Sequence, residues 1–184
     1  MCAVAVQTTD GQIAVRNASF GEGRFGFLND IENGRDAFIG HVGAHPEIHF
    51  LRTGILAVAL CHAKIEDRQG WQSLPQWMDA CDVVTVARGD LGSNLGLLHL
   101  PAAQKDMAAR CRRAGKPFLV VTQLLHTMTE HPTPTRAEVL DVYNAVLDGA
   151  SALMLTGETA RGRYPLEAVR WLLDIARQAE EDQK

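Results

Sequence analysis

The sequence lacks long hydrophobic runs, paired cysteine motifs and an excess of basic residues. No apolar stretch approaches the ~18 residues that a transmembrane helix requires, and neither a signal peptide nor a lipidation motif is present. The formal net charge of -4 gives no reason to expect a nucleic acid partner. The four cysteines form neither a CxxC motif nor a metal-ligand spacing. We therefore expect a cytoplasmic protein with buried, reduced thiols and with neither a membrane nor a nucleic acid as partner.

What the sequence does contain is a hairpin pattern followed by alternating strands and helices. Two β-type segments flank an Asp-Gly turn signal at 10–11, and a glycine-rich joint follows at 21–26. Strongly apolar segments then predict five strands, at 37–42, 56–61, 83–87, 118–122 and 151–156. Strands this apolar are buried on both faces of a parallel sheet that helices cover. The predicted fold is α/β, a partial TIM-barrel-like array of about five βα units with an N-terminal β-hairpin, because a full eight-unit barrel needs about 250 residues.

Local signals mark where several of the helices begin and end. Thr135 and Glu138 have the spacing of a capping box, which predicts a helix start. Pro165 is placed to open a final helix, and Gly115 is placed to close the helix expected at about 101–114. These signals support the alternation of strands and helices.

Polar residues stand at the carboxyl ends of the predicted strands, where parallel α/β folds place their chemistry. They are Lys64 and Glu66, Arg88 and Asp90, Thr122 and Gln123, and Thr156 and Glu158. Two carboxylates on adjacent strand ends suit Mg²⁺ or a similar cation, and a lysine beside it can neutralise charge on an enolate or phosphate oxygen. The alternative reading is structural: a solvated ion pair for the lysine and glutamate, and a helix cap for the aspartate.

Seven short motifs follow one another in an order and spacing that resemble the second half of the pyruvate kinase catalytic barrel. They are AKIE at 63–66, VARGDLG at 86–92, AGKP at 114–117, VTQLL at 121–125, PTRAE at 134–138, NAVLDGA at 144–150 and LTGETA at 155–160. The resemblance divides the chain into residues 1–26, a β-hairpin and joint similar to a remnant of the family's lid domain, and residues 27–184, a partial pyruvate kinase-like barrel.

The resemblance implies a role for each matching residue. Lys64 corresponds to the family's active-site lysine, and Glu66 and Asp90 to the carboxylates that hold a divalent metal, Mg²⁺ or Mn²⁺. Gly89 and Asp90, with Arg88 beside them, correspond to the segment that receives the substrate carboxylate. Thr122 corresponds to the threonine near the carbon that is protonated.

A second group of matches concerns assembly. Arg136 and Glu138 fall in a segment that lies near a subunit contact in the family. Five βα units leave two strand edges open, at about 37–42 and 151–156, and open edges invite pairing. We therefore predict a homodimer or higher oligomer, with the N-terminal hairpin as a further strand or cover.

The resemblance also shows what this sequence lacks. Nothing corresponds to the family's first three barrel strands, to most of the lid domain or to the C-terminal domain. Since phosphoryl transfer depends on charge stabilisation around the phosphates, we expect little or no kinase activity. The hypothesis is a repurposed metal-dependent enzyme, of lyase or isomerase type, that acts on a 2-oxo acid or another enolisable carbonyl. Two alternatives are half of a split pyruvate kinase, completed by a second chain, and a non-catalytic scaffold remnant.

Overall fold

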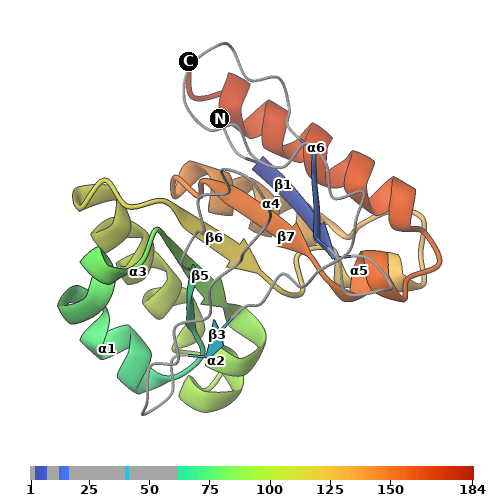
Figure 1. Cartoon of the computed structure of the whole chain (residues 1–184). Coiled ribbons are helices and arrows are strands. Elements are labelled where there is room, and N and C mark those ends of the chain that lie inside the picture. The colour runs from blue at the N-terminus through green and yellow to red at the C-terminus, as the bar shows by residue number, and fades with distance from the viewer. Residues whose placement is uncertain (1–2, 8–12, 17–39, 42–61) are drawn as a thin grey trace, which may run out of the picture. The chain divides into compact units, whose positions relative to one another are not determined.

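The computed structural model of the chain describes residues 3–7, 13–16, 40–41 and 62–184. These residues belong to two compact units. The first unit combines residues 1–34 with 121–184, and the second consists of residues 35–120. Each unit has its own strands and its own helices (Figure 1).

The second unit contains strands in the order β3-β4-β5-β6. Their bounds are Gly40–His41 for β3, His62–Ile65 for β4, Val83–Ala87 for β5 and Phe118–Val121 for β6, whose last residue belongs to the first unit. The β3–β4 and β4–β5 pairs are parallel. The helical elements of this unit are α1 (Arg68–Trp77), the 3₁₀ turn η1 (Met78–Ala80), α2 (Arg88–Leu95) and α3 (Leu100–Arg113).

The core of the second unit lies between these strands and helices. Ile65, Val84 and Val86 are fully buried, as the apolar strand patterns predict. Helix α3 packs against both β5 and α1, and it ends before Gly115, whose φ of 63° is the left-handed conformation expected at a helix C-terminus. The strand predicted at 56–61 lies outside the described residues, and β4 begins just after it.

The first unit contains strands in the order β2-β1-β7. They are β1 (Ala3–Gln7), β2 (Ile13–Arg16) and β7 (Ala152–Leu155). Its helical elements are the 3₁₀ turn η2 (His126–Thr129), α4 (Arg136–Leu147), α5 (Gly157–Ala160) and α6 (Pro165–Glu181). Helix α6 (red in Figure 1) contacts both α4 and the blue strand β1.

The N-terminal hairpin pairs with the last strand of the chain. β1 and β2 are antiparallel, which confirms the hairpin predicted from the Asp-Gly signal. β1 is also parallel to β7, with Val4 opposite Leu153 and Val6 opposite Leu155. The hairpin therefore covers the β7 edge that we expected to be open. This agrees with the expectation that the hairpin serves as a further strand. The predicted domain boundary at residue 26 lies outside the described residues.

The helix signals in the first unit are confirmed. Thr135 is the N-cap of α4, and its hydroxyl accepts from the Glu138 backbone N–H while the Glu138 carboxylate accepts from the Thr135 N–H. Pro165 is the first residue of α6. The two helices pack over a core that includes the fully buried side chains of Leu153, Leu155 and Leu172.

The fold is thus α/β, with parallel strands that alternate with helices along the chain. Across the described ranges, the structure contains no helix that is both long enough and apolar enough to cross a bilayer.

Candidate functional site

The lysine and the two carboxylates singled out in the sequence lie together in the second unit. Lys64 lies in β4, and Glu66 follows that strand directly. The Lys64 ammonium pairs with Glu66 Oε1, and Lys64 Nζ lies 3.8 Å from Asp90 Oδ2. Lys64 and Glu66 side chains are 21% and 10% exposed, whereas that of Asp90 is 68% exposed. Of the two carboxylates near Lys64, that of Glu66 is therefore nearly buried and that of Asp90 faces solvent.

Helix α2 places Asp90 there because it begins immediately after β5. Ala87, the last residue of the strand, is also the N-cap of the helix and gives it no side-chain cap. Arg88, Gly89 and Asp90 form the first turn, where backbone N–H groups point out of the helix and favour an anion. Asp90 is thus a first-turn residue and not the N-cap, so the cap reading of this residue is wrong. Arg88 is 8% exposed.

Glu66 and Asp90 both lie near one positive charge, the Lys64 ammonium. Glu66 Oε1 pairs with it, and Asp90 Oδ2 lies 3.8 Å from it. No group of three or more histidine, cysteine or acidic side chains with metal-binding geometry occurs in the part of the chain that the structure describes. A metal bound by these two carboxylates would complete its coordination with water or with oxygens of a bound substrate, as Mg²⁺ commonly does in proteins. The donor set therefore fits Mg²⁺ or Mn²⁺.

The two ion pairs of Lys64 differ in strength. A pair at 3.8 Å with a largely exposed partner contributes less than about 1 kcal/mol in water. The pair with Glu66 is more enclosed and is screened less. Lys64 is therefore held mainly by Glu66, and Asp90 is the more available carboxylate.

Thr122 belongs to the first unit and follows β6. Thr122 and Gln123 both have positive φ values, 73° and 52°. A β-branched residue in this region is rare and persists only where its surroundings fix it, so strained turns of this kind are found at functional sites. The placement of Thr122 beside Lys64 stays a prediction.

The turn after Thr122 is held by the buried carboxylate of Glu158. Glu158 is 1% exposed, and its Oε1 accepts from the Leu125 N–H at 3.2 Å. Its Oε2 accepts from the Thr156 N–H at 2.9 Å. Leu124 and Leu125 beside it are fully buried. Glu158 thus ties the turn after β6 to the end of β7.

Glu138, expected near a subunit contact, has a structural role within the chain. Its carboxylate accepts from the Thr127 N–H at 2.7 Å and from the Thr135 N–H at 2.8 Å, which joins η2 to the start of α4. Burial raises the pKa of Glu138, but the hydrogen bonds from Thr127 and Thr135 outweigh it and bring the pKa below its ordinary value. Arg136 is exposed at the start of the same helix.

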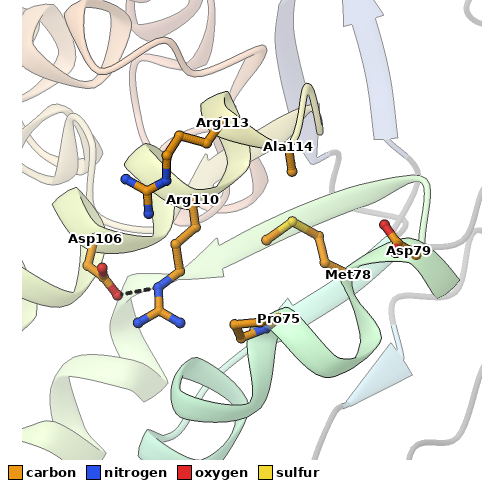
Figure 2. Close-up of a pocket in the computed structure, with 7 residues that line it drawn as sticks. All are labelled: Pro75, Met78, Asp79, Asp106, Arg110, Arg113 and Ala114. Atoms are coloured by element: carbon orange, nitrogen blue, oxygen red, sulfur yellow. Dashed lines mark ion pairs between the residues drawn. The ribbon is translucent and has the colours of Figure 1, made fainter.

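A cavity of about 460 Å³ lies elsewhere in the second unit, between α1–η1 and α3 (Figure 2). Its lining includes Asp106, Arg110 and Arg113. Asp106 Oδ2 accepts from Trp71 Nε1 at 2.7 Å and pairs with Arg110 Nε at 2.8 Å. The Asp106 carboxylate therefore holds α3 to α1. None of the predicted site residues lines this cavity.

Sequence reasoning missed Thr85 in the second unit. It is the polar residue within the apolar strand Val83–Ala87, and it is 1% exposed. The pairing of Thr85 with Lys64 depends on how two strands align, which the sequence does not show. The one sign of Thr85 in the sequence is that a polar residue interrupts an apolar run.

The comparisons with known proteins agree with the motif pattern. The model of the pyruvate kinase barrel domain matches residues 53–169. A pyruvate kinase of Schizosaccharomyces pombe is 51% identical over 117 residues, which is 64% of this chain and 23% of that protein. Pyruvate kinase PKLR of Homo sapiens is 48% identical over 118 residues, 64% of this chain and 21% of that protein. Plastidial pyruvate kinase 3, chloroplastic, of Arabidopsis thaliana is 39% identical over 158 residues, 85% of this chain and 28% of that protein.

The chain therefore spans about a quarter of the length of these curated relatives. The matched segment contains Lys64, Glu66, Arg88, Asp90 and Thr122. Because the barrel-domain model covers more than half of its residues, this chain belongs to the pyruvate kinase family.

Proposed function

We propose that this chain is a metal-dependent enzyme that forms or consumes the enolate of a 2-oxo acid, with little or no phosphoryl transfer. The supporting observation is the convergence of Glu66 and Asp90 on one positive charge at the start of α2. We also propose that its βα units are part of a TIM-type barrel, in keeping with the barrel-domain match.

Glu66 and Asp90 are the residues that would hold the divalent cation. A bound Mg²⁺ or Mn²⁺ would supply positive charge that stabilises an enolate and lowers the energy needed to form it. The cation would take the place of the Lys64 ammonium as a partner of Glu66, and the Lys64 charge would then be available to the ligand.

Lys64 and the first turn of α2 would bind the two ends of a 2-oxo acid. The backbone N–H groups of Gly89 and Asp90 hold the carboxylate at the helix N-terminus. The Lys64 ammonium hydrogen-bonds the carbonyl oxygen, on which negative charge develops when the enolate forms. The buried Arg88 adds positive charge to the same turn.

Thr122 would handle the proton at the carbon next to the carbonyl. Through one water, its hydroxyl relays a proton from the methyl group of pyruvate to the solvent. The C–H electron pair becomes the C=C bond of the enolate, and the π pair of the carbonyl moves to its oxygen. The reverse step returns a solvent proton to carbon. With oxaloacetate, the C–C bond breaks instead, CO₂ leaves, and the enolate is protonated to pyruvate.

The test is exchange of the pyruvate methyl protons in D₂O, followed by ¹H NMR with Mg²⁺ present. We expect exchange faster than that with Mg²⁺ alone, and we expect Lys64→Met to abolish the increase because it keeps the side-chain length and removes the charge. Lys105→Met is the matched control, since Lys105 is an exposed lysine on α3. Equal exchange by the wild-type chain and by Lys64→Met would contradict the proposal.

A split pyruvate kinase is the second proposal, and the match of residues 53–169 to the pyruvate kinase barrel domain supports it. In that case ATP formation from phosphoenolpyruvate and ADP requires a complementing chain. The observation that would favour it is co-purification of such a chain from the native host, with kinase activity in the complex and none in the isolated chain. If this protein binds neither a divalent metal nor a 2-oxo acid, the alternative of a non-catalytic scaffold remnant would be favoured. A cytoplasmic location stays a prediction, as one relative named above is chloroplastic.

A further inference from the structure

Thr85 carries a buried hydroxyl group. The residue is 1% exposed, and within the residues that the structure describes its Oγ1 has no hydrogen-bond partner. A buried hydroxyl without a hydrogen bond destabilises the folded state, so such groups are rare in native proteins and each requires an explanation. Valine has nearly the same shape without the hydroxyl and would fit this apolar strand better.

The strand register places this hydroxyl next to the site. Thr85 in β5 is the partner of Lys64 in the parallel neighbour β4. Paired residues of parallel strands project from the same face of the sheet, and adjacent strands lie about 4.8 Å apart. The alternate pairs, Ala63 with Val84 and Ile65 with Val86, project from the opposite face and are buried. Thr85 therefore shares the sheet face of Lys64.

The Lys64 side chain, which neighbours Thr85 in the register, is directed to other groups. The ammonium of Lys64 is directed to Glu66 and Asp90, at the end of its strand. A threonine hydroxyl can donate one hydrogen bond and accept two. If Lys64 leaves Glu66 to bind a ligand oxygen, that oxygen comes next to the neighbouring side chain in the register, which is Thr85.

We propose that Thr85 is a ligand-binding residue of the Lys64 site, whose hydroxyl donates a hydrogen bond to an oxygen of the bound 2-oxo acid. This inference rests on the proposed function above and extends it by one residue. It also accounts for a polar group that weakens the fold: the hydroxyl is retained for binding and not for stability.

The test measures ligand affinity and stability on the same set of full-length variants. Oxalate with Mg²⁺ is the probe, because it is a planar dianion with the shape of an enolised 2-oxo acid. Its Kd is measured by isothermal titration calorimetry, and the unfolding midpoint is measured by calorimetry without ligand. The variants are Thr85→Val, Thr85→Ser and Thr85→Ala. Thr129→Val, in the first unit, is the control for the substitution itself.

We expect Thr85→Val to bind oxalate about tenfold more weakly or worse, because a hydrogen bond to a charged group is lost. The same variant should unfold about 2–4 °C higher than the wild-type chain, since the unpartnered hydroxyl is gone. Thr85→Ser keeps the hydroxyl and should retain affinity, whereas Thr85→Ala should lose it. Thr129→Val should bind oxalate like the wild-type chain.

Two results would overturn the inference while leaving the proposed function intact. One is wild-type oxalate affinity in Thr85→Val, or equal affinities in the serine and alanine variants if the valine variant does not fold. The other is a lower unfolding midpoint in Thr85→Val, which would mean that the hydroxyl has a structural partner. Failure of the wild-type chain itself to bind oxalate with Mg²⁺ would overturn the proposed function, and this inference with it.

Discussion

Glu66 and Glu158 are two buried carboxylates that follow strands in different units of the chain, and they have different kinds of partner. Glu158, after β7, accepts hydrogen bonds from the backbone N–H groups of Leu125 and Thr156. These donors cannot leave without a change in the fold. Glu66, after β4, pairs with the ammonium of Lys64, at the end of a flexible side chain. A buried carboxylate that is bonded to backbone N–H groups stabilises the fold. A buried carboxylate that is paired with a flexible side chain can exchange that partner for another cation.

Replacing Glu66 should give the largest functional effect. Glu66→Gln removes one of the two carboxylates proposed to hold the cation, so we expect Mg²⁺-dependent exchange of pyruvate protons to fall about a hundredfold or more. Lys64 keeps Asp90 as a partner at 3.8 Å but loses its more enclosed one, so the free energy of unfolding should fall by about 1–3 kcal/mol. NMR exchange rates and urea unfolding measure the two quantities. A variant with full exchange activity would remove Glu66 from the site.

Replacing Glu158 should lower stability without any effect on metal binding. Glu158→Gln keeps one oxygen acceptor but turns an amide N–H₂ toward a backbone N–H, so we expect a loss of about 2–3 kcal/mol in the free energy of unfolding. Metal binding in the second unit should be unchanged. Urea unfolding and Mn²⁺ titration test both statements. If this variant is as stable as the wild-type chain, Glu158 is not the fixed carboxylate that the comparison requires.

The pH dependence of stability sharpens the comparison with a third carboxylate, Glu138. Its pKa is lower in the folded chain than its ordinary value, so its contribution to stability is present above the unfolded pKa and is lost as the pH falls through the folded pKa. Urea unfolding as a function of acid pH should therefore show a decline that Glu138→Gln makes shallower. Replacing its cap partner, Thr135→Ala, should cost about 1 kcal/mol at neutral pH. An unchanged acid slope in Glu138→Gln would contradict this role.

The smallest expected effect concerns Cys111. It is fully buried, and burial raises the pKa of its thiol to about 11, with a further contribution from Cys81 nearby. Since the thiolate is the reactive form, Cys111 should resist thiol reagents near neutral pH in the folded chain and react on unfolding. Mass spectrometry after alkylation with and without urea measures this, and rapid labelling of Cys111 in the folded chain would contradict it.

Self-association also stays a prediction. The hairpin covers the β7 edge, so β2 replaces β7 as the outer strand of the first unit. Light scattering at micromolar concentration should nevertheless find a dimer or larger species. A stable monomer would contradict this prediction and would mean that other parts of the same chain cover the strand edges.

Features set by neighbouring residues were predictable from the sequence. The antiparallel pairing of β1 with β2 was expected from the Asp-Gly signal in the sequence, the start of α4 from the Thr135–Glu138 spacing, and the start of α6 from Pro165. The proximity of Lys64, Glu66 and Asp90 was also predictable, because Lys64 and Glu66 come at the end of β4 and Asp90 follows its parallel neighbour β5.

Features set by distant residues were not predictable. The pairing of β1 with β7 joins residues that are about 150 positions apart, and no local pattern encodes it. Helix α2 is short and contains two glycines, so its pattern is weak. Thr122 and Gln123 are held in the left-handed region although neither is glycine, and the buried Thr85 becomes notable only through its register with Lys64.

A Mn²⁺ titration of four proteins, followed by electron paramagnetic resonance, tests the central claim most directly. The proteins are the wild-type chain, Glu66→Gln, Asp90→Ala and Glu158→Gln. The account predicts one Mn²⁺ bound by the wild-type chain and by Glu158→Gln, and none by the other two variants at the same concentrations. Binding that survives in Glu66→Gln and Asp90→Ala, or that is absent from the folded wild-type chain, would contradict the claim that these two carboxylates form a cation site.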